Sequence, residues 1–156
     1  RAGNVYTSDS GTGTIYRLSH GNVSAWLTDD RVTSPNGLFA ERGQLVVAAS
    51  DSKAQNPGNA RYMKSISYSG RTIKPLKDQV GLGAIDAVEP DGTGGYFLTD
   101  WGAGTVLYYT PEIGAVQLVK LGQGTADMDY VPETGMIYLP VMMSDELVAF
   151  KVTRKK

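Results

Sequence analysis

Short runs of apolar and β-branched residues alternate along the chain with clusters of glycine, proline and polar residues. The runs at 44–49 and 96–100 are rich in Val, Leu, Tyr and Thr, and polar or glycine-rich segments follow them. This pattern is typical of short β-strands joined by turns. No helical periodicity of useful length interrupts it, so we predict an all-β chain.

The same strand and turn pattern recurs along the chain. Residues 5–16 align without a gap on residues 96–107, so that Asp100 follows Asp9 by 91 residues. An intermediate copy ends at Asp51, 42 residues after Asp9, and a fourth copy begins 41 residues after the start of the third. A repeat of about 40 to 50 residues with four strands is typical of a β-propeller blade. A barrel or sandwich could use as many strands, but neither predicts this self-similarity.

The predicted fold is therefore a partial β-propeller of about three and a half four-stranded blades, part of a roughly six-bladed ring. We place the blade segments at about 1–30, 31–80, 81–122 and 123–156 of a single domain. The predicted strands are 4–9, 14–19, 22–28, 38–41, 44–49, 61–69, 72–76, 85–89, 96–100, 105–110, 115–120, 127–131, 136–142 and 147–152. The first and last blades have three strands each. Because exposed sheet edges are a liability, we expect another polypeptide, either a missing N-terminal portion or a second copy, to complete the ring.

Composition narrows the range of partners. The formal net charge is −1, with 20% charged residues, so we expect no nucleic-acid binding. There are no cysteines, which excludes disulfides and thiolate metal sites. No segment has the roughly 20 apolar residues that span a bilayer, so we expect no membrane partner. The compartment cannot be read from these features, and an exported or periplasmic protein is compatible with them.

One polar position recurs at or just before the first strand of three blades. It is occupied by Asn36, Asp86 and Asp127, which are spaced by 50 and 41 residues. Equivalent residues at the starts of innermost strands point toward one mouth of a propeller's central channel. Three oxygen-bearing side chains there could bind a hard divalent cation, and calcium is the ion we expect. The alternative is that these side chains hydrogen-bond nearby backbone N–H groups.

The box 35–38 (Pro-Asn-Gly-Leu), with strands that end in Ser-Asp or Thr-Asp before a glycine turn, resembles the gluconolactonase / senescence marker protein (regucalcin) family. The resemblance implies a six-bladed propeller that hydrolyses lactones with a bound metal, of which this chain matches the C-terminal part. It also implies that Asn36 is a metal ligand and that Asp86 is both a metal ligand and the catalytic base. The second box departs from the family's Pro-Asp-Gly, since Ile85 and Ala87 flank Asp86. Related propellers, including NHL and lyase types, share the turn pattern.

The leading expectation is metal-dependent hydrolysis of a small-molecule lactone or ester, in which Asp86 activates the attacking water. Two alternatives remain open. The chain could be a non-catalytic propeller scaffold that binds a protein or small molecule, or an assembly module whose open ends pair with another chain.

Further residues have mainly structural interpretations. We expect Asp9 and Asp100 to form Asx-type turns with the residues that follow them. Trp101 and the Met142-Met143 pair follow second strands, where they pack between blades or line the channel mouth. The insertion at 51–60 replaces the tight turn of the other blades.

Overall fold

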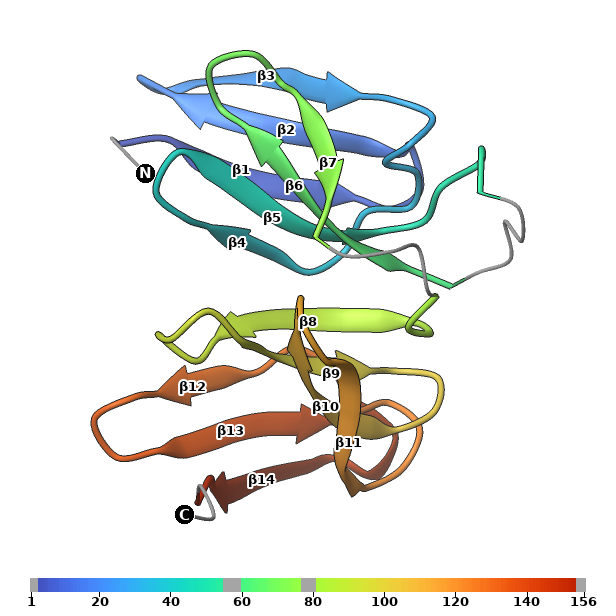
Figure 1. Cartoon of the computed structure of the whole chain (residues 1–156), viewed down its shortest axis with the longest axis vertical. Coiled ribbons are helices and arrows are strands. Elements are labelled where there is room, and N and C mark those ends of the chain that lie inside the picture. The colour runs from blue at the N-terminus through green and yellow to red at the C-terminus, as the bar shows by residue number, and fades with distance from the viewer. Residues whose placement is uncertain (1–2, 55–59, 77–80, 154–156) are drawn as a thin grey trace. The chain divides into compact units, whose positions relative to one another are not determined.

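The computed structural model describes residues 3–54, 60–76 and 81–153. The chain divides into two compact units, Arg1–Ile85 and Asp86–Lys156, and each is described by itself. Each unit contains sheets of antiparallel strands connected in sequence order (Figure 1). The described helical segment is a single 3-10 turn, η1 (Met142–Ser144). No helix in the described residues is long and apolar enough to cross a membrane.

Four sheets account for the strands, and we call them the first to fourth sheets in chain order. The first contains β1 (Val5–Asp9), β2 (Thr14–Ser19) and β3 (Asn22–Thr28), and the second contains β4 (Leu38–Ala40), β5 (Gln44–Ala49), β6 (Tyr62–Ser67) and β7 (Ile73–Pro75). The third contains β8 (Ile85–Pro90), β9 (Tyr96–Asp100), β10 (Thr105–Thr110) and β11 (Gly114–Lys120), and the fourth contains β12 (Asp129–Val131), β13 (Met136–Val141) and β14 (Glu146–Lys151). Every predicted strand is present, with ends displaced by at most two residues.

Each unit has its own apolar cluster. Trp26 and Ile15 of the first sheet pack with residues of β5 and β6 in the first unit. Phe97 and Val106 of the third sheet pack with residues of β13 in the second unit. The most deeply buried members are Ile15, Val32, Leu45, Val47, Ala49 and Ile66 in one cluster, and Ala87, Val106, Ile137 and Leu139 in the other. Burial of these side chains is the main force that holds adjacent sheets face to face.

Two of the tight turns are built on an aspartate. The Asp9 carboxylate accepts hydrogen bonds from the N–H groups of Gly11 (3.0 Å) and Thr12 (3.1 Å). The Asp100 carboxylate accepts equivalent bonds from Gly102 (3.0 Å) and the residue after it (2.9 Å). The predicted Asx turns are therefore confirmed, and they satisfy backbone donors that have no ladder partner.

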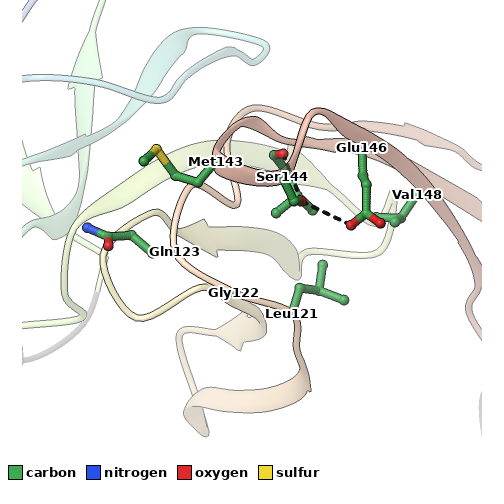
Figure 2. A pocket seen from close by; sticks show the side chains of 8 residues that line it. Leu121, Gly122, Gln123, Met143, Ser144, Glu146 and Val148 are labelled. Atoms are coloured by element: carbon green, nitrogen blue, oxygen red, sulfur yellow. Dashed lines mark hydrogen bonds between the residues drawn. The ribbon is translucent and has the colours of Figure 1, made fainter.

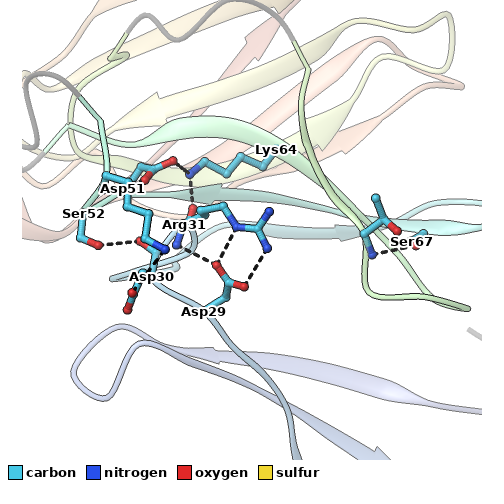
Figure 3. A network of polar contacts seen from close by, with 9 residues as sticks. Asp29, Asp30, Arg31, Asp51, Ser52, Lys64 and Ser67 are labelled. Atoms are coloured by element: carbon cyan, nitrogen blue, oxygen red, sulfur yellow. Dashed lines mark hydrogen bonds and ion pairs between the residues drawn. The ribbon is translucent and has the colours of Figure 1, made fainter.

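In the second sheet the aspartate at the corresponding position is Asp51, and it makes different contacts. Asp51 accepts a bond from the N–H of Lys53 (2.9 Å), and its other oxygen lies 2.8 Å from the ammonium of Lys64 on β6. The Lys64 ammonium also donates to the carbonyl oxygen of Arg31 (Figure 3). The Lys64 side chain is only 2% exposed, and burial lowers its pKa. The ion pair ties β6 to Asp51 just after β5, and the bond to Arg31 ties β6 to the segment between β3 and β4. Residues 55–59 of the predicted insertion lie outside the described residues.

Candidate functional site

Asn36 lies in a segment whose backbone is fixed from two sides. Its N–H donates to the carbonyl oxygen of Ala48 on β5 (3.0 Å), and the N–H of Ala48 donates to the carbonyl of Gly37 (3.0 Å). The Ser8 hydroxyl, at the end of β1, donates to the Asn36 carbonyl (2.9 Å). The Ser10 hydroxyl adds a bond to the preceding carbonyl (2.6 Å). These bonds fix the backbone at Asn36 beside the second sheet, and its side chain is half-buried.

Asp86 and Asp127 lie in the second unit, whereas Asn36 lies in the first. Asp86 is the second residue of β8 and is half-buried between buried neighbours. Asp127 precedes β12, is exposed, and accepts a hydrogen bond from the N–H of Met128 (3.0 Å). For Asp127, then, the structure shows the backbone-capping contact of the alternative interpretation.

Asn36 and Asp127 both lie shortly before the first described strand of their sheets. Asn36 lies two residues before Leu38, whose ladder partner on β5 is Val47. Asp127 lies three residues before Tyr130, whose ladder partner on β13 occupies the same place in the repeat as Val47. Both residues lie before their strands begin, where the backbone pairing leaves the strand register: Thr33 is paired with Ser50 on one side and Thr125 with Val141 on the other.

The predicted donors suit a hard cation in chemical type, because amide and carboxylate oxygens are the ligands that calcium prefers. Within residues 3–54, 60–76 and 81–153, no three or more carboxylate or histidine side chains are grouped so as to hold a metal ion.

A carboxyl group that the sequence analysis missed stands out in the second unit. Glu89, on β8, is half-buried, and burial raises its pKa to about 7, with the negative charges of Asp127 and Asp129 adding to the shift. A carboxyl group of this kind holds a proton near neutral pH and can donate it. The sequence signal was a second acidic residue, three positions after Asp86, among the apolar residues of β8.

Asp91, two residues further on, has the opposite behaviour. Burial alone would raise its pKa, but hydrogen bonds from Thr93, the Tyr108 hydroxyl (2.8 Å) and the Gly95 N–H (3.0 Å) lower it to about 2. Asp91 is thus a permanently charged structural anchor for the turn between β8 and β9. Burial raises the pKa of both Glu89 and Asp91, and the hydrogen bonds that Asp91 accepts explain why its pKa is nevertheless lowered.

A pocket of about 250 Å³ lies beside the turn between β13 and β14 (Figure 2). It is lined by Leu121, Gly122, Gln123, Val141, Met143, Ser144, Glu146 and Val148. All of these residues belong to the second unit. Met143, which the sequence placed at a channel mouth or in packing, lines this pocket and is 67% exposed.

No protein-family model matches the chain, and no curated protein sequence matches it. Solved structures do. A chain of the nidogen/laminin complex matches with a TM-score of 0.64 and 16% identity over 87% of this chain and 51% of that one. Virginiamycin B lyase from Staphylococcus aureus matches with a TM-score of 0.61 and 12% identity over 97% and 53%.

A protein that carries the provisional name gluconolactonase matches with a TM-score of 0.60 and 28% identity, over 86% of this chain and 43% of that chain. The chain thus spans about half the length of the solved structures it matches. These are propeller proteins, and they share the antiparallel sheets of three and four strands described above. The chain therefore has the fold of β-propeller blades, as its repeat predicts.

Proposed function

We propose that this chain is part of a propeller that hydrolyses a lactone or ester with the help of a divalent metal ion. The observation that carries the proposal is the 28% identity with the provisionally named gluconolactonase over 86% of the chain. The Pro35-Asn36-Gly37 box supports it independently, because its backbone is held rigidly on β5 and by Ser8. A rigid backbone is what a ligand-bearing loop requires.

Asn36, Asp86 and Asp127 are the residues that would hold the ion, with calcium as the expected cation. When bound, such an ion supplies a Lewis acid that polarises the substrate carbonyl. Asp86, which is half-buried on β8, takes the proton of the attacking water and then returns it to the leaving oxygen. Glu89 lies three residues further along the same strand, on its opposite face, so we assign it no part in this step.

The test is calcium titration by calorimetry together with gluconolactone hydrolysis, measured on the protein with a completed ring. Asp86→Asn should abolish hydrolysis, since removing a general base costs about 10²- to 10⁴-fold in rate. Asp9→Asn is the matched control, because Asp9 is an aspartate confined to an Asx turn and the amide oxygen can keep those bonds. A protein that takes up no metal, or an Asp86→Ala variant that loses stability but no hydrolytic rate, would identify a non-catalytic scaffold instead.

A partner is also part of the proposal. The first and fourth sheets have three described strands each, and the matched structures are about twice as long as this chain. We infer that another polypeptide, either a further portion of the same protein or a second copy, completes the ring. The intact mass of the native particle tests this, and a monomer of 16.7 kDa that binds calcium on its own would contradict it.

A further inference from the structure

The turn between β13 and β14 departs from the repeat at the residues that define it in the other sheets. A ladder pair closes this turn at Val141 and Glu146, just as Asp100 and Thr105 close the turn after β9, and four residues lie between in both cases. The substitutions at aligned positions are Val141 for Asp100, Met143 for Gly102, and Asp145 for Gly104.

These substitutions replace the aspartate-based hydrogen bonds of the turn after β9 with bonds from the Ser144 hydroxyl to the Val141 carbonyl (3.3 Å) and the Glu146 carboxylate (3.0 Å). Valine has no side-chain acceptor, so the Asx hydrogen bonds made by Asp100 have no counterpart from Val141. Asp145 has a φ of 54°, close to the 67° of Gly104, and caps the C-terminal end of η1; aspartate adopts this left-handed conformation more readily than most residues other than glycine. The turn therefore closes without the glycine of the repeat and carries Met143 where the turn after β9 has Gly102.

The altered turn forms one wall of the 250 Å³ pocket, and the opposite wall is a glycine-containing loop. The Gly124 N–H donates to the carbonyl of Trp101 (2.9 Å), and the Met142 N–H donates to the carbonyl of Gly124 (2.8 Å). A Cβ atom at Gly124 would lie 2.7 Å from the Cγ atom of Met143. The loop is therefore tied to both neighbouring turns, so the pocket is formed before any ligand arrives.

The lining combines an apolar interior with a single charge. Leu121, Val148 and the Met143 thioether supply apolar surface, and the Ser144 hydroxyl donates to the Glu146 carboxylate (3.0 Å; Figure 2). Glu146 forms no ion pair with a lysine or arginine in the part of the chain that the structure describes. A carboxylate beside apolar surface favours a ligand with an apolar body and a cationic head.

The size of the pocket limits the apolar body. A cavity of about 150 Å³ is enough to hold benzene, so 250 Å³ accommodates one ring with a short side chain. A thioether makes favourable contacts with aromatic rings, which suits Met143 as the wall nearest such a ring. We propose that this pocket binds a small primary amine with one aromatic ring, its ammonium on Glu146 and its ring against Met143. This inference does not depend on the proposed hydrolytic function.

Benzylamine is the probe that tests the proposal, with benzyl alcohol as its uncharged match. The chain has five methionines, so labelling their methyl groups with ¹³C gives a simple NMR spectrum. Benzylamine should shift the Met143 methyl signal, while that of Met142, which is 60% exposed but does not line the pocket, should stay in place. Met143→Ala assigns the signal and should weaken binding.

The charge is tested by Glu146→Gln, which keeps the shape and the bond to Ser144. It should weaken benzylamine binding about fivefold, as expected for an ion pair at an exposed site, and leave benzyl alcohol unaffected. Glu133→Gln, at an exposed acid elsewhere in the second unit, is the control and should change nothing. Equal binding of the two probes, equal shifts of Met142 and Met143, or no effect of Glu146→Gln would each overturn the proposal.

Discussion

The turn after β9 and the turn after β13 have the same length and close on equivalent ladder pairs, but they follow opposite rules. The first contains an aspartate that accepts two backbone N–H groups, and a glycine, Gly104, at its left-handed position. The second places a valine where the aspartate would be and an aspartate, Asp145, where the glycine would be. A methionine at the centre of the second turn lines a pocket.

The comparison shows which features of the turn after β9 are needed to connect two strands of a blade and which are not. Because the β13–β14 turn closes without the aspartate and without the glycine, neither is needed to connect two blade strands. Their presence in the other turns contributes stability and close packing, and their loss leaves room for side chains with another use. The comparison predicts graded effects when each feature is altered.

The largest effect is expected at Gly104. A Cβ atom there would collide with the backbone of Gly122, and the φ of 67° adds conformational strain. Gly104→Ala should lower the free energy of unfolding by about 3 kcal/mol or more, measured by urea denaturation. Gly92→Ala is the control, because its φ of 78° is similar but nothing lies within 4 Å of a Cβ atom. Equal losses in both variants would show that close packing at Gly104 is unimportant.

The next largest loss of stability is expected in the second sheet, where the buried Lys64 neutralises Asp51. Lys64→Met leaves Asp51, whose side chain is 14% exposed, without its cation. The expected loss is about 3 kcal/mol in the free energy of unfolding. Lys53→Met breaks an exposed pair with Asp30 (3.6 Å) and should cost less than about 0.5 kcal/mol. If the two variants were equally stable, the Asp51–Lys64 pair would have no structural role.

The next prediction concerns Glu89 on β8, whose pKa is raised by burial and by the nearby charges of Asp127 and Asp129. Its folded pKa of about 7 exceeds the unfolded value of 4.5, so the folded state binds the proton more tightly. Stability should therefore be greatest below pH 4.5 as far as this group is concerned, and fall as pH rises to about 7.

Glu89→Gln removes this loss, and the free energy of unfolding at pH 8 should rise by about 2 kcal/mol relative to the native chain. Urea midpoints measured at pH 5 and pH 8 provide the readout. Asp127→Asn should lower the pKa of Glu89 and reduce the pH dependence in part, because Asp127 is the first of the two charges that raise it. A wild-type midpoint that is the same at both pH values would contradict the assignment.

A smaller effect is expected at the Asx turn itself. Asp100→Ala removes the acceptor of two N–H bonds, of 3.0 and 2.9 Å, and should cost about 1 kcal/mol. Asp100→Asn keeps an oxygen in place and should recover most of that loss. Thermal unfolding distinguishes the two, and identical melting temperatures for both variants would show that the side-chain bonds are not what stabilises this turn.

The sequence predicted the fold well because its signals are local. The strand ends and the Asx turns at Asp9 and Asp100 follow from side-chain period and turn chemistry within a few residues. The repeat becomes visible when these local patterns are compared along the chain. The site was harder. Asn36, Asp86 and Asp127 stay a prediction, because spacing along the chain does not determine which way a side chain points before a strand begins. Glu89 was missed because its pKa depends on burial and on carboxylates about 40 residues away.

The smallest change in stability is expected at Asp145, where a substitution alters only the strain of the left-handed backbone conformation. Asp145→Gly relieves the left-handed conformation but gives the unfolded chain more freedom, so the free energy of unfolding should change by less than about 0.5 kcal/mol. Asp145→Ala, which keeps a Cβ atom in the same conformation, should lower it by about 1 kcal/mol. Because neither variant alters Met143 or Glu146, benzylamine binding should persist in both. Loss of binding in the glycine variant, with stability unchanged, would show that a rigid turn is what shapes the pocket.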